Sequence, residues 1–337
     1  RAALSENTVG GIIYLANNIV EPQQLTQMLY NTQTYALSAN GLPLFLAVDE
    51  EGGAVNRVAL NEAFKDDLPE ADARMVTKEL SPEGLYNVAN NIGKYLKKYG
   101  FNVDLAPVAD IALSDNSIMA ERSFGSEEEY VTDMAVNFAS GLKDAGVISC
   151  YKHFPGFGRA GENTDFASVS INAISEELKS IDAKPFERGI ENGLNMIMIS
   201  SALYPGLDEN PVPASMSEAI VTDYLKGELG FKGVVIADAL NAAAIADRYE
   251  PGEAAVAAFK AGCDLLLMPA DYDAAFKAVL EAYESGEISN ERLEDALTRI
   301  LTVKKEIDTS YLDGAAEKDS AETAEEGAQA DETEEGP

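Results

Sequence analysis

Short apolar runs alternate along the chain with longer stretches in which apolar residues recur at helical spacing. Runs of four or five residues, rich in Val, Ile and Leu, are typical of buried strands. The sequence predicts seven of them, at 11–15, 44–48, 103–107, 147–151, 196–200, 234–237 and 265–268.

The stretches between these runs predict helices, at 82–99, 130–145, 175–192, 217–229 and 254–261. Ser81 followed by Pro82 is typical of a helix start, with serine as the cap and proline in the first turn. A glycine ends each of the five helical patterns just before a strand, which is the usual C-terminal cap. Strands that alternate with helices in this way predict an α/β fold with a parallel sheet.

Composition limits the functions that are possible. The formal net charge is −33 over 337 residues, and such a charge repels phosphate backbones, so we expect no nucleic-acid partner. No apolar run reaches the ~20 residues that a membrane helix needs, so we expect no transmembrane segment.

Residues 314–337 hold nine acidic residues and one lysine. We therefore expect residues 313–337 to be a disordered tail or a linker.

The two cysteines, Cys150 and Cys263, each lie in or beside an apolar run. Two separate core thiols are therefore expected, and a disulfide is the weaker interpretation. Neither cysteine has a metal-binding spacing, and the chain has one histidine. We expect no metal and no cofactor.

Charged or polar groups follow most of the predicted strands. In parallel α/β folds the functional groups gather where the strands end. Several polar groups at one such face indicate a ligand rich in hydroxyls. They are Asp49, Asp110, Lys152, His153, Ser200, Ser201 and Asp238.

Four segments in register carry a family resemblance. They read VDEEGGAVNR (48–57), ERSFG (121–125), KHFPGFG (152–158) and FKGVVIADAL (231–240). Together they resemble the motifs of bacterial β-N-acetylglucosaminidases in glycoside hydrolase family 3. Their order and spacing agree from about residue 10 to residue 305, which makes the signal much stronger than one motif alone.

The resemblance implies a (β/α)8 TIM-type barrel over residues 1–312, and we expect its first strand to precede residue 1. It implies a hydrolase that removes terminal β-linked sugars, chiefly N-acetylglucosamine, from glycans such as peptidoglycan or chitin fragments. Asp238 would attack the anomeric carbon, with net retention. The matching sugar-binding positions are Asp49, Arg57, Arg122, Lys152 and His153. We expect a monomer that acts on carbohydrate outside the cell or at the bacterial cell wall.

Simpler interpretations stand beside these roles. Asp238 could cap a helix, because it lies between a strand and an Ala-rich helical run. The charged side chains of the other motifs could form salt bridges around the end of the barrel. Glu50 and Glu51 follow Asp49 directly, so the three side chains diverge. We expect these two glutamates not to be catalytic but to orient neighbouring pocket side chains or to stabilise the loop.

The sequence departs from the family at its acid/base. The family places an Asp-x-His pair after the KHFPGHG motif, and the corresponding positions here are Asn163 and Asp165, with Thr164 between them. Two further family histidines correspond to Phe157 and Ser201.

Three interpretations remain open. In the first, Asp165 is the acid/base, as carboxylic acids are in most glycosidases, with Glu162 as an alternative on the same loop. In the second, the chain is a sugar-binding relative that has lost turnover. In the third, it is a phosphorolytic relative, which the acidic charge of the chain disfavours.

Overall fold

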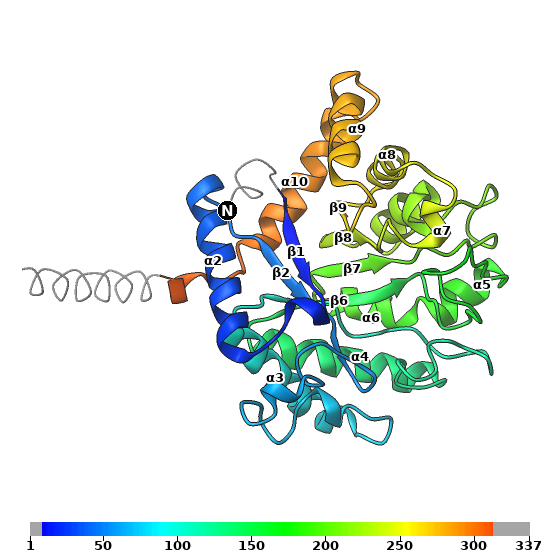
Figure 1. Ribbon diagram of the computed structural model, residues 1–337. Coiled ribbons are helices and arrows are strands. Elements are labelled where there is room, and N and C mark those ends of the chain that lie inside the picture. Colours follow the sequence, from blue (N-terminus) through cyan, green and yellow to red (C-terminus); the bar gives the residue numbers. More distant parts are fainter. Residues whose placement is uncertain (1–8, 313–337) are drawn as a thin grey trace, which may run out of the picture.

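The computed structural model describes residues 9–312, so the expected tail at 313–337 lies outside the described residues. Its centre is one parallel sheet of seven strands in chain order (Figure 1). All seven predicted strands are confirmed, with small shifts at their ends. They are β1 (Gly11–Tyr14), β2 (Phe45–Val48), β5 (Val103–Asp104), β6 (Ile148–Phe154), β7 (Met196–Ile199), β8 (Val234–Ala237) and β9 (Leu265–Leu266).

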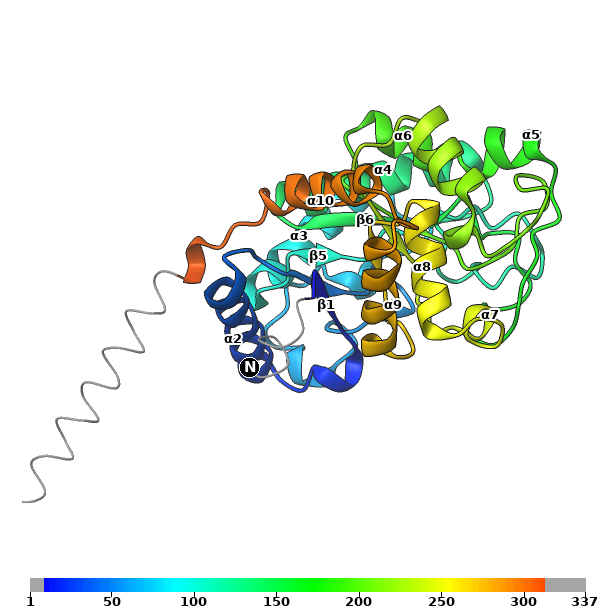
Figure 2. The same ribbon diagram turned by 90° about the horizontal axis from the view of Figure 1, so that it is seen from above.

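Helices connect the strands and surround the sheet, which curls into an α/β barrel (Figures 1 and 2). The five predicted helical stretches are all helical. Apart from five short 3-10 helices among the described residues, the helices are α2 (Pro22–Asn40), α3 (Pro82–Tyr99), α4 (Glu128–Asp144), α5 (Ser175–Glu177), η4 (Leu178–Asp182), α6 (Lys184–Glu191), η6 (Ala219–Glu228), α7 (Ala243–Ala246), α8 (Pro251–Ala261), α9 (Tyr272–Glu284) and α10 (Asn290–Lys304). As predicted, the Ser81 side chain accepts a hydrogen bond from Gly84 N at the start of α3.

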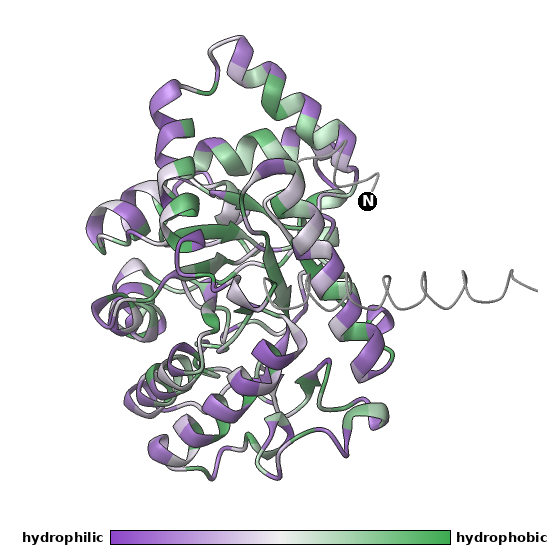
Figure 3. Cartoon of the chain, turned by 90° about the vertical axis from the view of Figure 1, so that its left-hand side faces the viewer, coloured by the Kyte–Doolittle hydropathy of each residue, from purple (hydrophilic) through white to green (hydrophobic). Residues whose placement is uncertain are grey.

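Side chains along each strand point alternately into the barrel and towards the helices, which divides the apolar core into two parts. In β2, Phe45 and Ala47 point into the barrel, whereas Leu46 and Val48 pack outward under the helices. The other strands follow the same period of two, because successive side chains of a strand lie on opposite faces. Figure 3 shows the result, with apolar strands inside and polar helix surfaces outside.

Helix α10 closes the end of the barrel at which the strands begin. Its Val303 belongs to the apolar cluster inside the barrel. Lys304 Nζ donates to the carbonyl of Pro43, just before β2. Arg299 donates to the carbonyls of Phe231 and Gly233, just before β8. The opposite end, where the strands finish, is therefore the open one.

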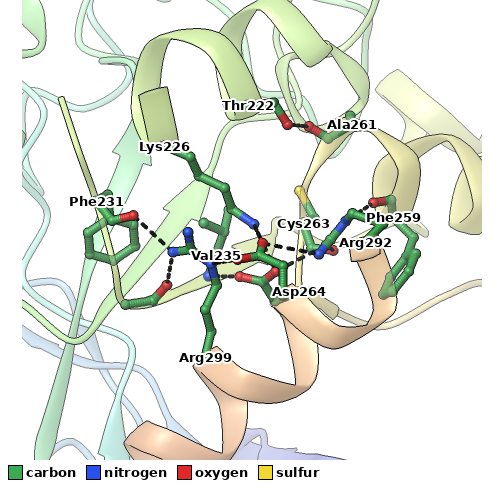
Figure 4. A network of polar contacts seen from close by, with 12 residues as sticks. Thr222, Lys226, Phe231, Val235, Phe259, Ala261, Cys263, Asp264, Arg292 and Arg299 are labelled. Carbon is green, nitrogen blue, oxygen red and sulfur yellow. Dashed lines mark hydrogen bonds and ion pairs between the residues drawn. The ribbon is translucent and has the colours of Figure 1, made fainter. Parts of the chain in front are cut away.

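Asp264 ties α10 to the sheet (Figure 4). Its side chain is buried just before β9, and it accepts hydrogen bonds from Lys226 Nζ at 2.9 Å, Arg292 Nη2 at 3.0 Å and the Val235 backbone at 2.9 Å. Its buried charge is thus compensated by two cations and one backbone donor. This arrangement fixes η6, α10 and the start of β8 relative to one another.

The two outer strands of the sheet face each other across a groove. Among the described residues, β1 pairs only with β2, and β9 pairs only with β8. Apolar residues of β1, β9 and α9 line the groove, whose volume is about 470 Å³. The eighth strand that we expected before residue 1 lies outside the described residues. Within residues 9–312, every helix is too short or too polar to span a lipid bilayer.

Candidate active site

A polar pocket of about 240 Å³ opens at the end of the barrel where the strands finish. It brings together all seven site residues that the sequence predicts. They are Asp49, Arg57, Arg122, Lys152, His153, Asp165 and Asp238. Residues more than 180 positions apart in the chain therefore share one cavity.

Strand alternation explains how three of these groups reach the pocket. Phe45 and Ala47 point into the barrel, and Asp49 is the next position of the same parity. Cys150 precedes Lys152 in the same way. Ile236 likewise precedes Asp238. Each strand thus contributes its last inward-facing residue, which lies past the apolar interior, as a charged group.

A chain of ion pairs crosses one wall of the pocket. Lys152 Nζ lies 2.7 Å from Asp49 Oδ1 and 2.6 Å from Glu51 Oε1. Arg122 binds Glu51 through two hydrogen bonds, of 2.9 and 2.6 Å. Arg57 lies 3.6 Å from the other oxygen of Asp49. Positive and negative groups alternate, so each is fixed in direction by its neighbours.

Glu51 lies at the centre of this series of ion pairs. Burial by itself would raise the pKa of its carboxyl, but the charges and hydrogen bonds of Lys152 and Arg122 lower it to about 2. Burial likewise opposes the charge on Lys152, and the charges of Asp49 and Glu51 still raise the pKa of its ammonium group. Glu51 thus orients two cations of the pocket that it also lines, which is one of the two supporting roles that we expected.

Glu50 has the other supporting role that we expected. Its buried carboxylate accepts hydrogen bonds from the backbone of Arg57, Val58 and Ala59, and from the Tyr95 hydroxyl. These contacts hold the hairpin of β3 (Glu50–Gly52) and β4 (Val55–Asn56) against the end of β2. Glu50 thereby positions the backbone of Arg57 at the pocket.

His153 is oriented by a buried carboxylate that the sequence did not single out for this role. Asp110 Oδ2 lies 2.8 Å from His153 Nδ1, and Asp110 Oδ1 accepts hydrogen bonds from the backbone of His153 and Phe157. The other ring nitrogen is therefore left to face the pocket that His153 lines. In residues 9–312, no three His, Cys, Asp or Glu side chains converge in an arrangement that could hold a metal ion.

Asp238 stands directly after β8. Its backbone N–H donates to the Ile199 carbonyl, which continues the strand pairing by one residue. One carboxylate oxygen accepts a hydrogen bond from Ala239 N at 2.8 Å. The next helix, α7, has Ala242 as its cap. The side chain of Asp238 is therefore not a helix cap, and it lines the pocket.

The loop that carries Asp165 is fastened to the segment that follows Asp238. The carbonyls of Thr164 and Asp165 accept hydrogen bonds from the backbone of Ala244 and Ala243. Asn163 and Asp165 also contact each other, since Asn163 Nδ2 lies 3.2 Å from Asp165 Oδ2 and Asp165 N donates to Asn163 Oδ1 at 3.0 Å. The Asp165 side chain lines the pocket but is exposed, whereas Glu162 is exposed and is not part of the lining.

The two other positions that differ from the family motif are buried. Phe157 packs edge-on against the His153 ring, with 5.9 Å between the ring centroids. The Ser201 hydroxyl is buried and has no hydrogen-bond partner among the described residues. Neither residue can carry a proton as an imidazole does, so an acid/base in this pocket must be one of the groups already described.

Both cysteines are buried and free, as predicted. Cys150 points into the apolar interior of the barrel. The thiol of Cys263 contacts the Ser215 carbonyl at 3.3 Å. Neither thiol lines the pocket.

Two known proteins are similar in sequence over most of this chain. An uncharacterized secreted glycosyl hydrolase of Arthroderma benhamiae is 33% identical over 313 residues, which cover 90% of this chain and 86% of that protein. A β-hexosaminidase of Nitrosomonas eutropha is 32% identical over 302 residues, which cover 87% of this chain and 83% of that protein.

A solved structure is similar as well. The family 3 β-N-acetylglucosaminidase of Paenibacillus sp. str. FPU-7 superposes with a TM-score of 0.85 at 34% identity. The match covers 90% of this chain and 57% of that one, so the chain spans little more than half of that enzyme. A sequence profile of the glycosyl hydrolase family 3 N-terminal domain matches residues 1–303. The chain belongs to glycoside hydrolase family 3.

Proposed function

We propose that this protein is a retaining glycosidase that removes terminal β-linked N-acetylglucosamine. The observation that carries the proposal is the pocket itself, in which Asp238 shares a small cavity with a preorganised set of donors and acceptors. Its volume lies below the roughly 300–1,000 Å³ of pockets for drug-sized ligands, so one sugar ring fits it better than a longer glycan. Relatives named β-hexosaminidase support the same activity.

The ion-paired wall binds the sugar hydroxyls. Arg122 and Lys152 donate, and Asp49 accepts. His153, whose Nδ1–H donates to the Asp110 carboxylate, can accept through its other ring nitrogen. The Nε of Arg57 is buried and has no partner among the described residues. The rest of the guanidinium is partly exposed beside Asp49 in the pocket, so its terminal nitrogens can donate to a sugar oxygen.

The reaction takes two steps. In the first, the Asp238 carboxylate attacks the anomeric carbon while protonated Asp165 gives its proton to the leaving oxygen, so the glycosidic bond breaks and an ester forms. In the second, ionised Asp165 takes a proton from water, whose oxygen attacks the same carbon and releases Asp238. Two inversions give net retention, and both side chains return to their first state.

A sugar-binding protein without turnover is the second candidate. The exposed side chain of Asp165 favours it, since a general acid works best when it is shielded from water. Both candidates bind the same sugar through the same wall, so only turnover separates them.

Aryl glycosides separate the two candidates. Wild type should release aryl alcohol fastest from the N-acetylglucosaminide in a panel that also contains the glucoside and the xyloside. Asp238→Asn should abolish release and leave the fold intact, whereas Asp247→Asn, an exposed aspartate nine residues later, should change nothing. Release from no glycoside, together with binding of N-acetylglucosamine, would replace the enzyme with the binding protein.

We further propose that the protein acts as a monomer, on a glycan found outside the cell or in the cell wall. The similarity to a secreted glycosyl hydrolase supports this location. Fractionation of the source cells, followed by an activity assay of each fraction, would test it.

A further inference from the structure

The loop beside the pocket displays an aromatic ring that packs against little of the protein. Phe166 is 81% exposed, more than any other large apolar side chain among residues 9–312. Leaving such a ring in water forfeits the hydrophobic stabilisation that burial would provide. The turn itself is held in place by two hydrogen bonds. Phe166 N donates to the Asn163 carbonyl at 3.1 Å, and the Asp165 carbonyl accepts from Ala243 N. A fixed turn that exposes an aromatic ring is suited to contact with something outside the chain.

The position of Phe166 relative to the pocket indicates what it contacts. Asp165 lines the pocket, and Phe166, the next residue, does not. In the proposed reaction Asp165 protonates the oxygen that joins the first sugar to the second. Adjacent Cα atoms lie only ~3.8 Å apart, so the Phe166 side chain begins beside the pocket lining, next to the acid that we assign to that oxygen.

We propose that Phe166 is the stacking platform for the second sugar ring, which makes the preferred substrate a β-linked disaccharide or longer glycan. This inference rests on the proposed function of the same site. A pyranose ring presents apolar C–H groups on its face and hydroxyls at its edge, so its face is complementary to an aromatic ring. The neighbouring acidic residues, Glu162 and Asp165, make an anionic lipid surface a poor partner for this loop.

Two substrates test the platform. In the N-acetylglucosamine disaccharide the leaving group carries a second sugar ring. In N-acetylglucosaminyl fluoride the leaving group is a single fluoride ion. Phe166→Ala should lower kcat/KM for the disaccharide about tenfold, mainly through KM, and alter the fluoride less than about twofold. Phe166→Trp should keep most of the disaccharide activity. The matched control is Phe276→Ala, a half-exposed phenylalanine on α9 that should affect neither substrate. An unchanged disaccharide rate, or an equal loss on both substrates, would overturn the proposal.

Calorimetry keeps the test independent of turnover. In an Asp238→Asn background, Phe166→Ala should weaken binding of the disaccharide about tenfold and leave binding of N-acetylglucosamine unchanged. If wild type hydrolyses nothing but this difference in binding remains, the proposed reaction fails and the platform stands. If Phe166→Ala leaves disaccharide binding unchanged, the platform fails, whatever the activity.

Discussion

Glu51 and Lys152 form a buried ion pair at the wall of the pocket, with 2.6 Å between Oε1 and Nζ. The same carboxylate oxygen binds Arg122. One glutamate therefore fixes two of the cations that we assign to sugar binding. Removing one partner of such a buried pair leaves an uncompensated charge, which costs about 3–5 kcal/mol.

Replacing Glu51 should therefore weaken sugar binding. In Glu51→Gln, Arg122 loses its anionic partner and Lys152 keeps only Asp49, so kcat/KM should fall at least about tenfold through a rise in KM. Glu51→Asp should recover part of the loss, and Glu79→Gln, an exposed glutamate, should behave as wild type. A normal KM in a folded Glu51→Gln variant would show that this pair does not position the binding groups.

The Glu51 carboxyl also predicts a pH dependence of stability. Its pKa is about 2 in the folded protein, against an ordinary value of 4.5. A lowered carboxyl pKa stabilises the fold above pH 4.5, here by about 3 kcal/mol, and this stabilisation is lost as the pH falls towards 2. The difference in unfolding free energy between wild type and Glu51→Gln, measured in urea, should therefore shrink from pH 6 to pH 3. A difference that grows over this range would contradict the assignment.

Asp165 should act in both steps of the reaction. An activated aryl leaving group needs little protonation, so Asp165→Ala should form the glycosyl-enzyme and hydrolyse it slowly. A burst of aryl alcohol should precede a low steady rate in stopped-flow absorbance. Azide, which needs no general base, should restore turnover and give a β-glycosyl azide. If Asp165→Ala turns over like wild type, the acid/base lies elsewhere, and Glu162→Ala is the next variant to measure.

Asp264 should matter for stability and not for chemistry, because it lies at the end of the barrel opposite the pocket. Asp264→Ala leaves the cations of Lys226 and Arg292 without this partner, and should lower the unfolding free energy by about 3–5 kcal/mol. Glu294→Ala, at an exposed position of α10, should cost less than about 0.5 kcal/mol. Denaturation in urea measures the unfolding free energy of both variants. A loss below about 1 kcal/mol for Asp264→Ala would show that the contacts of Asp264 contribute little to stability.

The thiols should react only when the protein unfolds. Burial raises the pKa of both cysteines, that of Cys263 to about 12, so almost no thiolate exists at neutral pH. Labelling with a thiol reagent should follow unfolding by denaturant. Rapid labelling of the native protein would contradict the buried positions of these side chains.

The sequence predicted the fold well because local and global signals agree. The apolar runs of β2 and β8 have the length and composition of buried strands, and each capped helix between strands reinforces the βα order. Positions past the end of a run, such as Asp49 and Asp238, could be assigned to the pocket because functional groups gather where parallel strands end, and the family motifs include both residues.

Contacts between distant segments could not be predicted from the sequence. Asp110 is one of several polar residues near strand ends, and only the folded chain brings it to His153. Glu51 lies beside two other acids, so spacing could not show that its side chain turns towards Arg122. The hairpin that turns it is held by Glu50, through backbone donors that no sequence pattern marks.

The covalent intermediate on Asp238 tests the central claim most directly. The Asp165→Ala variant, mixed with an activated aryl N-acetylglucosaminide and quenched in acid after the burst, should retain one sugar per chain. Peptide mass spectrometry should locate an N-acetylhexosamine residue on the peptide that contains Asp238, and on its carboxyl group after fragmentation. A burst without an adduct, or an adduct on any other side chain, would contradict a double displacement through Asp238.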